Sequence, residues 1–101
     1  MIGLGYSNGA NILASVILAR PALFGRAVLM HPLIPWTPEP APVTTRVLIT
    51  AGERDPICPP DMTRALEGWF RAQGAPVEIY WHPGGHEIER GEIVAVADFL
   101  R

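Results

Sequence analysis

Two short apolar runs constrain the fold of this chain more than any other feature. Residues 27–30 and 46–51 are each too short for a typical helix, and Arg46 is the one charged residue that they contain. Runs of this kind are typical of strands that are buried on both faces of a parallel sheet. Stretches with helical spacing lie before the first run and after the second. This alternation predicts an α/β fold, a parallel sheet with flanking helices.

Periodicity indicates the remaining elements. Residues 1–4 form a short apolar strand stub, and residues 77–81 alternate between apolar and polar side chains, which predicts a half-exposed, peripheral strand. Residues 8–20 are apolar almost all round and predict a largely buried helix. Two further stretches are amphipathic helices, residues 61–73 and a last one from about residue 89. Their expected apolar faces are Met62, Ala65, Leu66, Trp69 and Phe70 in the first, and Ile93, Val96, Ala97 and Leu100 in the second.

Composition excludes several classes of protein. The 101 residues are 49% hydrophobic and 18% charged, a balance that excludes intrinsic disorder. The net charge of −2 argues against nucleic acid as a partner, because phosphates require a basic surface. Small domains have much surface to cover with polar groups, so this apolar balance also suggests the inner part of something larger.

The sequence contains no feature that predicts a membrane span. The longest apolar run, residues 12–19, is too short to cross a bilayer, and Gly3, Gly5 and Gly9 interrupt any signal-peptide core. Cys58 is the single cysteine and cannot form an internal disulfide, which fits a reducing compartment. We therefore expect a cytoplasmic protein, unless a segment before Met1 carries a signal.

A glycine-flanked serine lies between the first strand and the first helix. The segment G-Y-S-N-G, residues 5–9, fits the pattern G-x-S-x-G. A serine on so sharp a strand-to-helix turn needs neighbours without side chains, and its Oγ then projects above the sheet at a helix N-terminus. Alone the pattern is weak, but these flanking elements strengthen it. Ser7 is therefore a candidate nucleophile.

Two other side chains could activate this serine. A serine nucleophile needs a base, and the base needs an orienting acid. Asp55 follows the second buried strand and His86 follows the last strand, which gives the chain order serine, carboxylate, histidine. Ligands bind beyond the carboxyl ends of parallel strands, and Ser7, His31, Asp55 and His86 all follow strands. We expect them on one edge of the sheet, with His86 as base and Asp55 as acid.

Three segments together resemble the signature of the α/β-hydrolase superfamily. They are G-Y-S-N-G-A-N, A-G-E-R-D-P and P-G-G-H-E, which begin at residues 5, 51 and 83. The chain is most similar to the phospholipase/carboxylesterase branch, which is related to the dienelactone hydrolases. This resemblance implies a serine esterase with Ser7 as nucleophile, Asp55 as acid, His86 as base and the Asn8 backbone N–H in the oxyanion hole. It also implies a small-molecule ester substrate, an acyl-enzyme intermediate and no cofactor.

The resemblance covers only the C-terminal half of the family's fold. About four strands that precede the nucleophile strand in the family have no counterpart here. Residues 1–101 would therefore be a partial domain of about four strands and three helices. It would run from the nucleophile elbow, the turn that carries Ser7, to the final helix. A missing loop normally supplies the second oxyanion-hole N–H. The first strand would expose an unpaired edge, which would suit a homo-oligomer.

Other residues have a structural explanation beside a functional one. Tyr6, Ile34 and Trp36 are candidate substrate-binding residues, although the last two could equally anchor a proline-rich loop. His82 is interpreted as structural, His31 as a packed or exposed loop residue that could also line the pocket, and Cys58 as a small buried residue rather than a reactive thiol. Glu53 and Asp61 are rival acids that we expect to be solvated.

Three alternatives remain at this point. His82 and His86 have the i, i+4 spacing of a zinc helix, but Pro83, Gly84 and Gly85 between them oppose a helix and hence a metal site. The glycines at 3, 5 and 9 loosely match a dinucleotide-binding βαβ module, but the expected acidic residue is absent from residues 25–31. The third alternative is a catalytically inactive, truncated hydrolase fragment.

Overall fold

The computed structural model describes residues 1–20, 22–32 and 42–101. Its elements are β1 (Ile2–Tyr6), α1 (Asn8–Ala19), β2 (Arg26–Met30), β3 (Arg46–Gly52), α2 (Pro60–Ala72), β4 (Val77–His82) and α3 (Arg90–Phe99). Each strand and helix expected from periodicity is present, with ends that differ by one or two residues. Ile34 and Trp36 lie outside the described residues.

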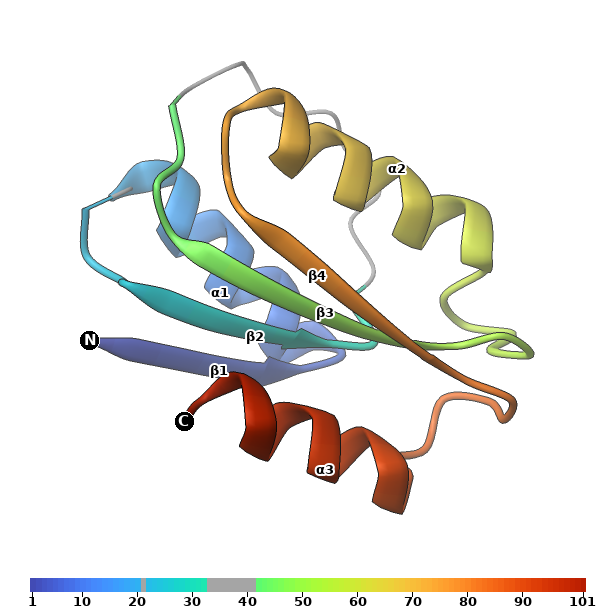
Figure 1. Cartoon of the computed structure of the whole chain (residues 1–101). Helices are drawn as coiled ribbons and strands as arrows, with labels where there is room; N and C mark the ends of the chain where they lie inside the picture. Colours follow the sequence, from blue (N-terminus) through green and yellow to red (C-terminus); the bar gives the residue numbers. More distant parts are fainter. Residues whose placement is uncertain (21, 33–41) are drawn as a thin grey trace.

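The four strands form one parallel sheet in the order β1-β2-β3-β4. Helices α1 and α2 pack on one face, and α3 packs on the other (Figure 1). Because all strands run the same way, their carboxyl ends lie along one edge of the sheet. The predicted α/β architecture is therefore confirmed.

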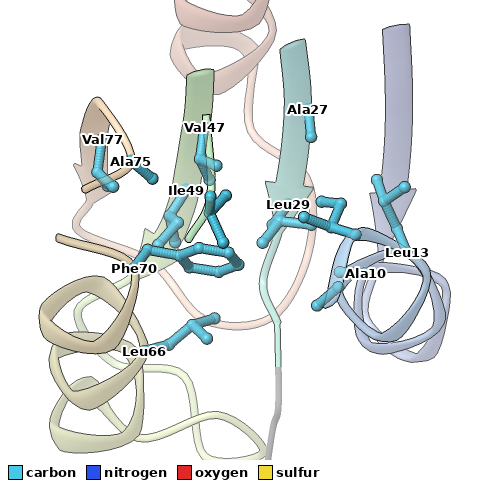
Figure 2. Packing of buried hydrophobic residues seen from close by; sticks show 13 residues of the cluster. Ala10, Leu13, Ala27, Leu29, Val47, Ile49, Leu66, Phe70, Ala75 and Val77 are labelled. Carbon is cyan, nitrogen blue, oxygen red and sulfur yellow. The ribbon is translucent and has the colours of Figure 1, made fainter. Parts of the chain in front are cut away.

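The larger hydrophobic core lies between the sheet and the pair of helices α1 and α2. Figure 2 shows Phe70 of α2 packed beside Ile49 of β3, while Ala10 and Leu13 of α1 lie near Leu29 of β2. The smaller core joins α3 to the opposite face of β2 and β3, through Val28, Met30, Leu48, Val96 and Phe99. The short apolar strands are thus covered on both faces, as their sequences predict.

The prediction of a largely buried α1 was wrong. Only one stripe of this helix, Ala10, Leu13, Ala14 and Ile17, is buried, whereas Ile12 is 67% exposed. The reason is that α1 packs on the sheet with one face, and no described residue covers its outer face. Strand β1 is likewise an edge strand, with Leu4 57% exposed.

The buried faces of the other two helices also differ in part from those expected. Helix α2 buries Thr63, Leu66 and Phe70, while Ala65 is exposed. Helix α3 buries Glu92, Val96 and Phe99, while Ile93 and Ala97 are exposed. In α3 the difference has a specific cause. The carboxylate of Glu92 is hydrogen-bonded to His31 and Thr50 beneath the helix, so the face that carries Glu92 is turned toward the sheet.

Candidate active site

The carboxyl-terminal ends of the strands bring four predicted side chains together. Ser7 follows β1, His31 follows β2, Asp55 lies three residues after β3, and His86 lies in the loop after β4. Their strands end at the same edge of the sheet (Figure 1). The predicted convergence on this edge is thus present in the structure.

Ser7 occupies a strained turn between β1 and α1. Its φ of 54° and ψ of −116° are rarely adopted by residues other than glycine. Its backbone N–H donates to the carbonyl of Met30 at 2.8 Å, which ties the turn to the neighbouring strand. A Cβ on Gly5 would lie 2.5 Å from the carbonyl oxygen of Gly9, so Gly5 is needed for this turn. A Cβ on Gly9 would meet nothing within 4 Å, so the predicted crowding there is not found among the described residues.

His86 lies between Ser7 and Asp55. Its Nε2 is 2.8 Å from Ser7 Oγ, and its Nδ1 is 2.6 Å from Asp55 Oδ2. If Nδ1 donates its proton to the carboxylate, Nε2 is left as an acceptor for the serine hydroxyl. The imidazole side chain is 16% exposed, whereas the Asp55 side chain is 1% exposed. A reactant could therefore approach the serine and the imidazole, while the carboxylate is shielded from water.

Asp55 is held as a carboxylate by the groups around it. Its Oδ1 accepts the backbone N–H groups of Ile57 and Cys58, each at 2.8 Å, and its Oδ2 accepts from two imidazoles. Burial alone would raise the pKa of Asp55, but the hydrogen bonds from Cys58, His86, His31 and Ile57 outweigh it and lower that pKa. The rival acids, Glu53 and Asp61, are both exposed.

The loops that carry Asp55 and His86 approach each other at Gly52. The N–H of Arg54 donates to the Gly84 carbonyl at 3.0 Å, and the N–H of Glu53 donates to the His82 carbonyl at 2.8 Å. A Cβ on Gly52 would clash with the carbonyl oxygens of Gly84 and Gly85. The absence of a side chain at Gly52 thus sets the distance between the acid and the base.

Replacing Gly52 with alanine should therefore separate the two loops. Because a shift of about 1 Å in a reacting group can cost roughly 10²-fold in rate, we expect the covalent labelling of Ser7 by a fluorophosphonate to slow by about that factor. Gly85→Ala is the matched control, since its Cβ would be 3.4 Å from its nearest neighbour, an ordinary contact. Equal labelling rates of the two variants would contradict this explanation of Gly52.

Tyr6 contacts the His86 loop. Its hydroxyl donates to the backbone carbonyl of His86 at 2.5 Å, and the two ring centroids are 5.4 Å apart. Burial, followed by the negative charge of Asp55, raises the pKa of Tyr6, so the phenol remains a donor. This contact fixes the position of His86. A role of Tyr6 in substrate binding remains a prediction.

Sequence reasoning missed a second group of polar side chains behind Asp55. His31, Thr50, His82 and Glu92 are each no more than 1% exposed, and hydrogen bonds or close ionic contacts join them. The burial of His82 is consistent with its interpretation as structural, and His31, for which the sequence left packed and exposed positions open, is packed. Glu92 was assigned to no site. A signal was present in the sequence. Glu92 lies four residues before Val96, which places the two side chains on the same face of the helix.

Two sets of side chains have the donor atoms that could hold a metal ion, namely His31, His82 and Glu92, and His31, Asp55 and His86. In the first set the backbone N–H of Gly84 donates to His82 Nδ1 at 3.0 Å. An imidazole that accepts at Nδ1 carries its proton on Nε2, the atom that faces Glu92, and a protonated nitrogen cannot ligate a metal. In the second set His86 is bonded to Ser7. Hydrogen bonding accounts for both arrangements.

Cys58 is buried against Thr63, with its Sγ 3.4 Å from the hydroxyl and also bonded to the carbonyl of Pro32. Burial raises the pKa of Cys58, which disfavours the thiolate. The expectation of a small buried residue is consistent with this position. No helix among the described residues is long and apolar enough to cross a membrane.

Comparisons with known proteins agree with the fold. The chain is 36% identical over 94 residues to MhqD of Bacillus subtilis (strain 168), which is named as a hydrolase; the match covers 91% of this chain and 47% of MhqD. Protein Atu2452 of Agrobacterium tumefaciens strain C58 is 64% identical, with a TM-score of 0.94 over 98% of this chain and 50% of its own. The Bacillus cereus carboxylesterase is 33% identical, with a TM-score of 0.92 over 98% of this chain and 48% of its own.

The chain thus spans about half the length of these proteins. The model of the dienelactone hydrolase family matches residues 1–88, a range that includes Ser7, Asp55 and His86. The chain belongs to the dienelactone hydrolase family, within the α/β-hydrolase superfamily.

Proposed function

We propose that this chain carries the catalytic residues of a serine hydrolase that cleaves carboxylic esters through an acyl-Ser7 intermediate. The observation that carries this proposal is the bridging position of His86, with Nε2 2.8 Å from Ser7 Oγ and Nδ1 2.6 Å from Asp55 Oδ2. Three residues distant in the sequence have the geometry that a nucleophile, a base and an orienting acid require. The likeness to a carboxylesterase supports esters as substrates.

The chemistry follows from this arrangement. His86 Nε2 takes the hydroxyl proton as Ser7 Oγ attacks the ester carbonyl carbon, and a tetrahedral oxyanion forms. His86 then gives the proton to the departing alkoxide, which leaves as an alcohol. Water attacks the acyl-serine with His86 again as base, and the carboxylic acid is released. Asp55 holds the imidazole in the required tautomer and stabilises its charged form.

The oxyanion would be held in part by the first residue of α1. Asn8 follows the nucleophile directly, and its backbone N–H lies at the positive end of that helix. A second donor, which the family draws from an earlier loop, would have to come from outside the described residues. Removing one such donor costs on the order of 3 kcal/mol in the transition state, so we expect a contribution of that order from the Asn8 N–H.

We further propose small or medium acyl esters as substrates, with Tyr6, Ile34 and Trp36 beside the acyl group, and a cytoplasmic location. Long-chain esters, the substrates of a phospholipase-like activity, are the second candidate substrate class. The apolar edge at β1, where Ile2 is 54% exposed and Leu4 57% exposed, is proposed to be covered in the functional protein, by further strands or by a second copy of the chain.

A series of p-nitrophenyl esters tests the proposal. We expect hydrolysis of the acetate and butyrate that exceeds the uncatalysed rate and that falls for the palmitate. A folded chain that hydrolyses none of these esters would favour the alternative hypothesis of a catalytically inactive, truncated hydrolase fragment. Tight binding of NAD by the same preparation, measured by calorimetry, would instead favour the hypothesis of a dinucleotide-binding βαβ module.

A further inference from the structure

A buried polar cluster lies directly behind Asp55, and the proposed triad does not include it. Its members are His31, Thr50, His82 and Glu92, which come from the end of β2, from β3, from β4 and from α3. Buried polar groups are retained at a cost unless they are fully hydrogen-bonded. No buried side-chain nitrogen or oxygen in the described residues lacks a partner, so this cluster is complete.

His31 faces a carboxylate with each of its ring nitrogens. Its Nδ1 lies 3.1 Å from Asp55 Oδ2, and its Nε2 lies 2.9 Å from Glu92 Oε2. A neutral imidazole has a single N–H and would turn a lone pair toward one of these oxygens. Both contacts are favourable only if both nitrogens are protonated, so the geometry indicates an imidazolium.

The surroundings of Glu92 favour its ionised form. The Thr50 hydroxyl donates to Oε2, and the backbone N–H of Glu89 donates to Oε1 at 3.1 Å. Burial would raise the pKa of Glu92, but the hydrogen bonds from His31, Thr50 and Glu89 outweigh it and lower that pKa. Burial would lower the pKa of His31, but its bonds to Glu92 and Asp55 outweigh it and raise that pKa above its ordinary 6.5.

We propose that His31 is a positioning residue, an imidazolium clamped by Glu92 that fixes the Asp55 carboxylate against His86 and places a positive charge beside the His86 ring. This inference rests on the proposed function of Ser7 and His86. Asp55 Oδ2 is shared by His31 and His86, whose ring centroids are 5.3 Å apart. A positive charge on His86 would therefore lie close to the one on His31, and the two like charges would repel each other.

The groups that face His31 come from every element around it. They are Tyr6 of β1, Asp55 after β3, His82 of β4, His86 after β4 and Glu92 of α3. Of these, Asp55 and Glu92 are the anions. His82 accepts the Gly84 N–H at Nδ1 and is therefore neutral, with its Nε2 proton toward Glu92. His31 thus supplies the positive charge that lies between the two carboxylates.

Nitrogen NMR of the histidine rings tests the charge on His31 without any assay of activity. We expect both ring nitrogens of His31 to be protonated at pH 7.5, with each proton protected from exchange. His82 should show a single proton, on Nε2. A neutral His31 at pH 7.5 would overturn the proposal.

The pH profile of Ser7 labelling by a fluorophosphonate tests the positioning role. In His31→Gln the cation is lost, so the acid limb of the second-order rate constant should move up by about one pH unit, and labelling at a pH on that limb should slow about tenfold. Glu92→Gln should shift the limb in the same direction, because His31 then loses the carboxylate that holds its second proton. His82→Gln, equally buried but neutral, is the matched control and should leave the limb in place.

The pH dependence of unfolding gives a second measurement. The lowered pKa values of Asp55 and Glu92 stabilise the fold above their ordinary values of 3.8 and 4.5, and this contribution is lost as pH falls through the folded values. The raised pKa of His31 stabilises the fold below 6.5, and this contribution is lost as pH rises through the folded value. The cluster therefore contributes most between 4.5 and 6.5. In urea titrations, His31→Gln should be most destabilised in that window.

The two proposals fail in different ways. If wild-type protein shows no Ser7-dependent labelling at any pH, the proposed function fails while the NMR result for His31 stands. If wild type is labelled but His31→Gln and Glu92→Gln have the same acid limb as His82→Gln, the positioning role fails and the proposed function stands.

Discussion

Ser7→Ala should lower kcat/KM for p-nitrophenyl acetate by about 10⁵-fold or more, to the level of the solution reaction or slightly above it. Alanine retains the backbone of the turn but removes the oxygen that lies 2.8 Å from His86 Nε2. Without it no acyl-enzyme can form, and residual catalysis would come from the oxyanion site and from water activated by His86. Steady-state kinetics measure the effect.

Ser15→Ala is the matched control, because Ser15 is an exposed serine of α1 whose hydroxyl donates within its own helix, to the carbonyl of Asn11 at 3.1 Å. Its kinetics should be those of the wild type. A Ser7→Ala protein that remains folded and keeps more than about a tenth of the activity would show that another residue performs the chemistry.

Asp55→Asn should lower kcat by about 10⁴-fold at neutral pH. The asparagine side chain has the right shape, but its amide has no charge and can present an N–H toward an imidazole. It then favours the tautomer of His86 that carries its proton on Nε2, the wrong nitrogen to accept from Ser7. The effect here should extend to stability, because the same carboxylate oxygen also accepts from the buried His31 at 3.1 Å.

Glu53→Gln serves as the control for Asp55→Asn. Glu53 lies two residues away, is exposed, and is one of the two rival acids that the sequence offers, with Asp61. The Glu53→Gln variant should retain the kcat of the wild type and its stability to urea. If Glu53→Gln lost activity and Asp55→Asn did not, the acid would have been assigned to the wrong carboxylate.

Much of the fold could be predicted from local pattern because the relevant forces are local. The runs at 27–30 and 46–51 have strand length and strand composition, and a parallel sheet then places Ser7, Asp55 and His86 on one edge. The need for glycine at position 5 also follows from the sharp turn, since a Cβ there would meet the next helix at 2.5 Å.

What the sequence could not reveal depends on contacts between distant elements. The apolar pattern of α3 suggested a face that includes Ile93, yet Glu92 is the buried residue because His31 and Thr50 supply its hydrogen bonds. The requirement at Gly52 has the same origin, since its neighbours Gly84 and Gly85 are some thirty residues later in the chain. Periodicity cannot report such tertiary partners.

The account depends most on Ser7 Oγ being the nucleophile, activated by His86. Reaction of the folded chain with a fluorophosphonate, followed by peptide mass spectrometry, tests this directly. We predict a single covalent adduct, located on Ser7 and absent from Ser7→Ala. An adduct on any other residue, an adduct that persists in Ser7→Ala, or a folded chain that stays unlabelled would contradict it.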